Sequence, residues 1–95
     1  MTVSEKTIEA FCVKEASIRG GKAIKGTTIN TKGFPDRIIV LPGGRVGFLE
    51  LKRPGKKPTA LQAHWIKHLQ TLGCVAGYAD TKEGVIKFMD ILQDA

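Results

Sequence analysis

Apolar residues recur along the chain with two different spacings, and these spacings separate predicted helices from predicted strands. Three stretches repeat about every 3.6 residues and predict amphipathic helices. The first is expected from residue 4 to about residue 18, with Ser4 as its N-cap. The second opens at Thr59 with the pattern T-x-x-Q, which predicts a capping box, and ends near Gly73. The third follows residues 80–83, and its apolar residues cover more than one face: Val85, Ile86, Phe88, Met89, Ile91 and Leu92.

β-branched and aromatic runs predict strands between and after the first two helices. Residues 23–31 are rich in β-branched residues and are expected to form the first strand. Two apolar runs, residues 38–41 and 46–49, flank a Pro-Gly-Gly turn at residues 42–44 and predict a β-hairpin. Residues 74–79 predict a short buried strand, parallel to the second hairpin strand because a helix connects the two. The resulting order is αβββαβα, an α/β fold with a mixed sheet flanked by helices.

The chain has 95 residues, and residues 1–95 are expected to form a single domain with one modest core. Its hydrophobic content of 42% and charged content of 25% are ordinary for a globular protein. No apolar run approaches the roughly 20 residues of a membrane span, and the first residues lack the apolar core of a signal peptide. We therefore expect a cytoplasmic protein that does not associate with a membrane.

The charge balance of the chain favours polyanions, above all nucleic acid, as partners. Its 15 Lys and Arg residues exceed its 9 Asp and Glu residues, so the net charge is +6. Charge alone fits an ordinary basic protein equally well, and Lys25 fits an exposed strand residue as well as one that reaches DNA. The aromatic residues do not interleave with the basic ones, so phosphate contacts are expected rather than base stacking. The candidate contact residues are Lys25, Arg37, Arg53, Lys56 and Lys57.

Charged residues gather at one end of the predicted hairpin. Asp36 stands just before its first strand, and Glu50 and Lys52 stand two residues apart at the end of its second. A strand alternates its faces with period two, so Glu50 and Lys52 point to the same side, and antiparallel pairing brings Asp36 to the same end. Two carboxylates in an otherwise apolar hairpin require a compensating cation. Alternatively, Glu50 and Lys52 form a same-face ion pair on an exposed edge strand.

These residues also stand at the positions of a known motif. Pro35-Asp36 and Glu50-Leu51-Lys52, whose acids are 14 residues apart, resemble the two halves of the PD-(D/E)xK nuclease motif. The segments GFPDR, LPGGR and ELKRPG are typical of the VRR-NUC (virus-type replication-repair nuclease) family, and the resemblance covers nearly the whole chain. It implies a restriction-endonuclease-like core of the order αβββαβ(α).

The resemblance implies an Mg²⁺-dependent nuclease that hydrolyses the phosphodiester bonds of DNA, with Mn²⁺ as an alternative ion. Asp36, Glu50 and the backbone carbonyl of Leu51 would bind the metal through oxygen atoms, which suit hard cations. Lys52 would position the attacking water or stabilise the charge that develops on the phosphate.

The resemblance further implies a glutamate on the first helix and a glutamine ten residues after Lys52, here Glu5 and Gln62, which would orient water at the metal. Plotted at about 100° per residue, Glu5 falls inside the apolar sector of the first helix and Glu9 falls nearer its edge. Both assignments have structural alternatives. The helix dipole favours an acid in the first turn, and Gln62 can cap the N–H of Thr59.

The resemblance also implies a stand-alone viral protein that acts as a homodimer on branched DNA, such as a four-way junction, in the host cytoplasm. The sequence has no separate recognition module, so we expect selectivity for DNA shape. Apolar residues on the third helix, with Trp65, Ile66 and His68 on the second, independently favour a two-fold dimer. Two other functions stay open: a catalytically silent DNA-binding module of the same fold, and an end-processing or RNA-directed nuclease.

Overall fold

A computed structural model describes residues 3–26 and 30–95 and confirms the expected order of helices and strands. Ser4, Thr59 and Thr81 are N-caps, and the side chain of each accepts a hydrogen bond from a backbone N–H in the first turn of its helix. The capping box predicted at Thr59 is present. In chain order the described elements are α1 (Glu5–Ile18), β1 (Lys22–Lys25), β2 (Arg37–Leu41), β3 (Arg45–Leu51), α2 (Ala60–Thr71), β4 (Val75–Ala79) and α3 (Lys82–Asp94).

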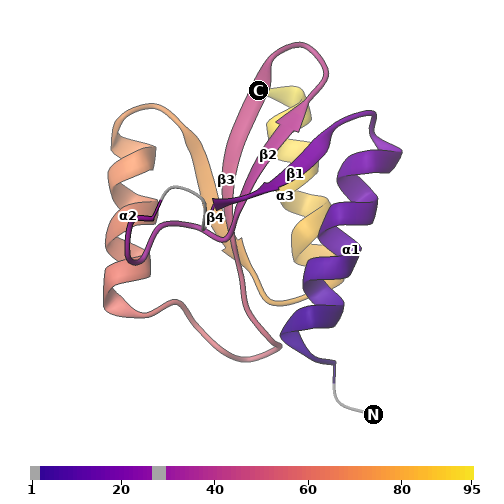
Figure 1. The fold of residues 1–95 in the computed structure, drawn as a ribbon. Coiled ribbons are helices and arrows are strands. Elements are labelled where there is room, and N and C mark those ends of the chain that lie inside the picture. Colours follow the sequence, from indigo (N-terminus) through magenta and orange to yellow (C-terminus); the bar gives the residue numbers. More distant parts are fainter. Residues whose placement is uncertain (1–2, 27–29) are drawn as a thin grey trace.

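The described strands form one mixed sheet in the order β1-β2-β3-β4, with helices on both faces (Figure 1). β1 and β3 each pair antiparallel with β2, and β4 pairs parallel with β3, as expected. The hairpin between β2 and β3 turns at Gly43 and Gly44, whose φ angles of 89° and 71° are left-handed and suit glycine. α1 and α3 pack together on one face, and α2 packs over β4 on the other.

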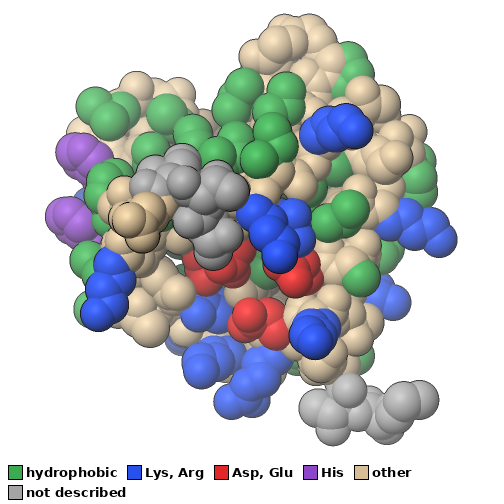
Figure 2. Space-filling view, in the orientation of Figure 1, with side chains coloured by type: hydrophobic (Ala, Val, Ile, Leu, Met, Phe, Trp, Pro, Cys, Tyr) green, Lys and Arg blue, Asp and Glu red, His purple; other side chains and the backbone are tan. Residues whose placement is uncertain are grey.

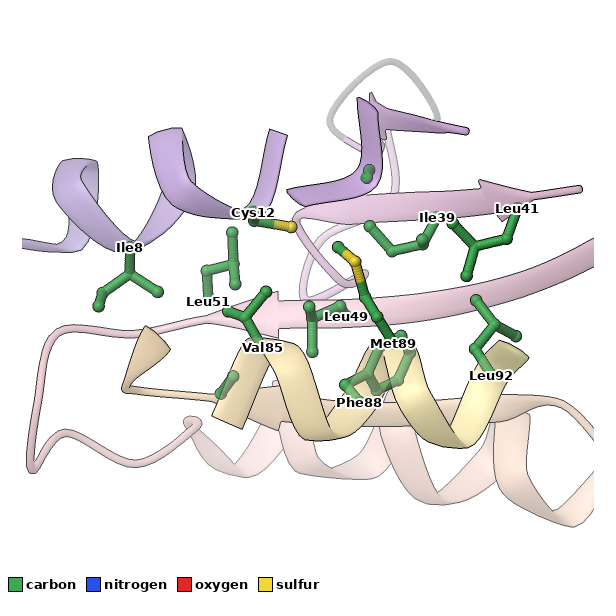
Figure 3. Close-up of a cluster of buried hydrophobic side chains, with 12 residues drawn as sticks. Ile8, Cys12, Ile39, Leu41, Leu49, Leu51, Val85, Phe88, Met89 and Leu92 are labelled. Carbon is green, nitrogen blue, oxygen red and sulfur yellow. The ribbon is translucent and has the colours of Figure 1, made fainter. Parts of the chain in front are cut away.

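The hydrophobic core lies between the sheet and the layer formed by α1 and α3 (Figure 3). α1 contributes a single buried stripe at helical spacing, which consists of Ile8, Cys12 and Ala16. The sheet and α3 contribute Ile39, Leu41, Leu49, Leu51, Ala79, Val85, Phe88, Met89 and Leu92. A search of residues 3–26 and 30–95 finds no helix with the length and apolar content needed to cross a membrane.

The expectation that the last helix is apolar on more than one face is confirmed. The buried residues of α3 recur at three- and four-residue spacing and form one stripe against the sheet. Ile86 and Ile91 lie outside this stripe and are 37% and 54% exposed. α3 therefore packs on its own sheet through one stripe and leaves two apolar side chains exposed, and its expected contact with a second subunit stays a prediction.

The first strand is shorter than the expected residues 23–31. β1 ends just before Gly26, and residues 27–29 of the expected strand lie outside the described residues. The strand ends where Gly26 crosses closely over Pro35, since a Cβ at Gly26 would lie 2.0 Å from the Pro35 carbonyl oxygen. The N–H of Gly26 donates a hydrogen bond to the Asp36 carbonyl oxygen at 2.7 Å. This crossing therefore fixes the backbone of Asp36 at the start of β2.

Candidate functional site

The structure brings Asp36 and Glu50 together at one end of the hairpin. The strand register pairs Arg37 with Leu49, which makes Asp36 and Glu50 neighbours across β2 and β3. Asp36 is half-buried, and its Oδ2 accepts a hydrogen bond from the N–H of Leu51 at 3.1 Å. Glu50 is 1% exposed. The two carboxylates thus occupy one small region in which one of them has almost no access to water.

Lys52 is the cation of this cluster. Its Nζ lies 3.5 Å from Glu50 Oε2, and the residue is 7% exposed. The contact confirms that Glu50 and Lys52 face the same side. β3 is a central strand between β2 and β4, so the alternative of an ion pair on an exposed edge strand is wrong. Two carboxylates are therefore held beside one ammonium group in a place that contains little water.

The buried carboxylate of Glu50 is electrostatically unfavourable in the protein alone. Burial, and then the neighbouring Asp36, raise the pKa of Glu50 from 4.5 to about 8, against the opposing effect of Lys52. Its Oε1 is buried and has no hydrogen-bond partner among the described residues. An unpaired buried acceptor destabilises the fold, so this oxygen is suited to a ligand that the described part of the chain does not supply.

The cluster fits a hard divalent cation. Asp36 and Glu50 offer carboxylate oxygens, which Mg²⁺ prefers, and a cation would offset the repulsion between the two acids. Within the part of the chain that the structure describes, no three His, Cys, Asp or Glu side chains converge on one point. Backbone oxygens and water could supply further ligands, and the expected role of the Leu51 carbonyl stays a prediction.

Gln62 caps α2 and also borders the carboxylate cluster. Its Oε1 accepts a hydrogen bond from the N–H of Thr59 at 2.9 Å, and Thr59 Oγ1 accepts one from the N–H of Gln62 at 3.2 Å. The same residue lines a hollow of about 510 Å³ together with Asp36 and residues 30–34. The capping role is confirmed, and the site role stays a prediction that this placement allows.

Glu5 lies on the side of the first helix that carries Ile8 and Cys12, but it is exposed, so the expectation that it is buried is wrong. α1 enters the core at Ile8, one turn after its start, and this leaves Glu5 exposed. Its role near the metal stays a prediction. Glu9, which the helical plot placed near the edge of the apolar sector, is half-buried, and its Oε2 lies 3.0 Å from Arg37 Nη2.

Arg37 is buried, which contradicts its expected contact with DNA. The residue is 8% exposed, it is paired with Glu9, and its Nη1 donates a hydrogen bond to the Ala23 carbonyl oxygen at 3.0 Å. A guanidinium that is bonded inside the protein is not open to a phosphate. Arg37 instead connects α1 and β1 to the start of β2, next to Asp36, and the local sequence pattern carries no signal for this pairing.

The other candidate contact residues are exposed. Lys25 ends β1, and Arg53, Lys56 and Lys57 lie in the loop of residues 53–58 between β3 and α2, here named the basic segment. Figure 2 shows acidic side chains gathered on one face of the molecule, with Lys and Arg side chains around them. A negative centre with a positive border can hold a cation and the phosphates that accompany it.

Comparisons with known proteins agree with this geometry. The protein named "Putative nuclease p44" of Acyrthosiphon pisum secondary endosymbiont phage 1 is 39% identical over 71 residues, which are 75% of this chain and 76% of that protein. A solved structure described as a VRR_NUC domain superposes with a TM-score of 0.81 at 22% identity, over 90% of this chain and 94% of that chain. This second likeness shows the fold. No family model matches the chain.

Proposed function

We propose that this chain, which belongs to the VRR-NUC family of nucleases, is a divalent-metal-dependent endonuclease that hydrolyses the phosphodiester bonds of DNA. The observation that carries the proposal is the buried Glu50 carboxylate beside Asp36, with one oxygen that lacks a partner among the described residues. A strongly perturbed acid at such a position supports a functional role for its charge. Mg²⁺ is the proposed ion, and Mn²⁺ is the alternative.

Each residue of the cluster has a proposed part in the reaction. Asp36, Glu50 and the Leu51 carbonyl would hold the metal, which when bound supplies Lewis-acid activation of the phosphate. Lys52 donates hydrogen bonds to the phosphate oxygen on which negative charge develops, or orients the attacking water. Because Lys52 is almost fully buried, its charge acts where little water screens it.

Two further residues would orient water. Gln62 uses its Oε1 to cap Thr59, so its amide N–H groups are the part of the side chain that can serve the site. Glu5 is exposed in the first turn of α1 and is proposed to reach solvent ligands of the metal through water. The basic segment and Lys25 would contact DNA phosphates, which position the substrate without reading its sequence.

The first prediction is that cleavage requires a divalent metal and depends on DNA shape. Duplex, single-stranded, flap and four-way-junction DNA, and RNA, would be incubated with Mg²⁺, Mn²⁺ or EDTA. We expect the four-way junction to be cut fastest with Mg²⁺ and no cutting in EDTA, because two close carboxylates repel the phosphate until a cation lies between them. Preferential cutting of ends or of RNA would redirect the substrate, and DNA binding without cutting in any metal would indicate a silent module.

We also propose that the protein acts as a homodimer on branched DNA. α2 packs over β4, and on the same face of the sheet Ile24 and Val46 are 46% and 44% exposed, next to the half-buried Ile38 and Val40. Figure 2 shows hydrophobic side chains gathered over this part of the sheet. Glu50 faces the same side, since it lies four residues after Val46 along β3 and side chains alternate with period two. A two-fold contact here would place two sites near one DNA molecule.

The second prediction concerns mass in solution. Light scattering coupled to size-exclusion chromatography is expected to give twice the chain mass of 10.3 kDa. A Val46→Glu variant is expected to be monomeric, because a charge at the centre of the apolar face would be buried without a partner. Ile91→Glu on α3 is the matched control and should leave the dimer intact. A monomeric wild type that still cuts both strands of a junction would contradict this assembly.

A further inference from the structure

The basic segment directly follows Lys52 and is held in a defined shape. Its residues Arg53, Lys56 and Lys57 are exposed, and a turn joins the N–H of Lys56 to the Arg53 carbonyl oxygen at 3.1 Å. Gly55 adopts a φ of 84°, which is left-handed and favours glycine. Pro54 and Pro58 restrict the backbone on either side of the turn. Its three cations are therefore presented from a loop of low conformational freedom.

The carboxylate of Asp80, which directly follows β4, also holds the basic segment. Asp80 Oδ2 accepts a hydrogen bond from the N–H of Gly55 at 2.9 Å. The bond spans the sheet end, because β3 and β4 are parallel and pair Leu51 with Ala79, and the N–H of Lys52 donates to the Ala79 carbonyl oxygen at 3.0 Å. Asp80 therefore stands beside the chain as it leaves β3, and its side chain reaches forward to the centre of the basic segment.

A carboxylate in this place needs an explanation. An acid beside a phosphate-binding loop repels DNA, so its charge alone lowers affinity. Asp80 is half-buried, and within the described residues its side chain bonds to the backbone of Gly55 rather than to a Lys or Arg side chain. This bond joins the end of β4 to the basic segment, and it fixes the loop at Gly55, the residue with the greatest conformational freedom.

We propose that Asp80 is a positioning residue that holds the basic segment in its DNA-contacting shape. With the loop already ordered, Lys56 and Lys57 meet phosphates without the entropy loss of ordering a flexible loop on binding, and the affinity for DNA rises accordingly. This inference rests on the proposed function, because it takes DNA as the ligand of the segment. The inference attributes the higher affinity for DNA to the order of the loop and not to the charge of Asp80.

Three variants separate loop order from charge. Asp80→Ala removes both the charge and the acceptor, whereas Asp80→Asn removes the charge and keeps an oxygen that can accept from Gly55. Asp94→Ala removes one charge at the far end of α3 and is the matched control. Circular dichroism would establish that each variant is folded. If charge alone mattered, all three would bind DNA as tightly as the wild type or more tightly.

Trypsin measures the order of the segment without any DNA. Trypsin cleaves after Lys and Arg but not before Pro, so the bond between Lys56 and Lys57 is its target in the sequence RPGKKP. Asp80→Ala is expected to be cut there about tenfold faster than the wild type, because the loop opens more often. Asp80→Asn and Asp94→Ala should be cut at the wild-type rate. An unchanged rate in Asp80→Ala would overturn the proposal.

DNA binding and turnover complete the test. Titration of a labelled four-way junction in EDTA is expected to show about three- to tenfold weaker binding for Asp80→Ala, and no loss for Asp80→Asn or Asp94→Ala. With Mg²⁺, KM should rise for Asp80→Ala while kcat is kept. The double change Lys56→Ala and Lys57→Ala is expected to lower the salt dependence of binding by about one to two phosphate contacts.

The outcomes distinguish this inference from the proposed function. A looser segment in Asp80→Ala with unchanged DNA affinity would overturn the positioning role and leave the nuclease proposal standing. A wild type that binds and cuts no DNA would overturn both, even if trypsin shows that Asp80 orders the loop. Equal losses of affinity in Asp80→Ala and Asp80→Asn, with trypsin cutting both at the wild-type rate, would show that Asp80 does not act through the order of the loop and would overturn the proposal.

Discussion

Replacement of Glu50 by glutamine is expected to abolish DNA cleavage and, at the same time, to stabilise the metal-free protein. The amide keeps the size of the side chain but loses the charge with which it would bind a cation. The same change removes a buried carboxylate that lies beside Asp36 and has an oxygen without a partner in the described structure. Loss of function and gain of stability in one variant are the signature of a functional charge held in an unfavourable place.

The gain in stability should depend on pH. The folded protein raises the pKa of Glu50 from 4.5 to about 8, so the folded state binds a proton more tightly than the unfolded chain does. The free energy of unfolding of the metal-free wild type therefore falls as the pH rises from about 4.5 to about 8, where folding must bury a charge. Glu50→Gln lacks this dependence on pH. Above that range, its free energy of unfolding should exceed that of the wild type by on the order of 2–4 kcal/mol, and below that range the two proteins should be equally stable.

Thermal unfolding in EDTA between pH 4 and pH 9, together with a junction-cleavage assay in Mg²⁺, would measure both effects. Glu83→Gln, at an exposed position in the first turn of α3, is the matched control, and it should change the stability and the rate of cleavage only slightly. Wild-type cutting by Glu50→Gln would remove Glu50 from the mechanism. Equal stability of variant and wild type at all pH values would contradict the burial of an ionised carboxylate.

Replacement of Lys52 by methionine is expected to lower kcat by about a hundredfold or more while DNA binding is largely kept. The change preserves an unbranched side chain in a nearly buried position and removes the ammonium group that lies 3.5 Å from Glu50. Removal of a preorganised charge from a reacting phosphate has effects of about this size. Affinity should change little, because Lys52 is one of 15 Lys and Arg residues and is mostly hidden from solvent.

Single-turnover cleavage and anisotropy titration would separate rate from affinity for Lys52→Met. Lys87→Met, on the exposed side of α3, is the matched control and should leave the rate unchanged. If affinity falls as much as the rate, Lys52 belongs to substrate binding. If neither falls, the proposed role at the phosphate is wrong.

Patterns that depend on near neighbours in the chain could be predicted from the sequence. The capping box at Thr59 and Gln62 needs residues three positions apart, and the hairpin needs two apolar runs and a glycine turn. Glu50 and Lys52 are two residues apart, so the strand period alone placed them on one face. The pairing of Asp36 with Glu50 followed because the hairpin register brings the two ends together.

Features that depend on distant segments could not be predicted. Arg37 looked like a phosphate ligand because its partner Glu9 lies on a helix that the local pattern does not connect to it. The first strand was predicted to be longer because β-propensity does not reveal that Gly26 crosses over Pro35 and ends the strand. The hydrogen bond between Asp80 and Gly55 could not be predicted, because the two residues come together only when β4 pairs with β3.

The order in which this protein folds follows from the parallel pairing of β3 with β4. The hairpin of β2 and β3 closes through a short turn, whereas Gly47 meets Val75 only after the chain has passed through the basic segment and α2. Contacts between close neighbours in sequence lose less chain entropy and form sooner. We therefore expect Asp36 and Glu50 to meet in an early hairpin, and the bond from Gly55 to Asp80 to form late. A destabilised variant that releases β4 first would keep Asp36 and Glu50 together. It would also expose the edge of β3, and an unpaired strand edge is a surface through which partly unfolded chains aggregate.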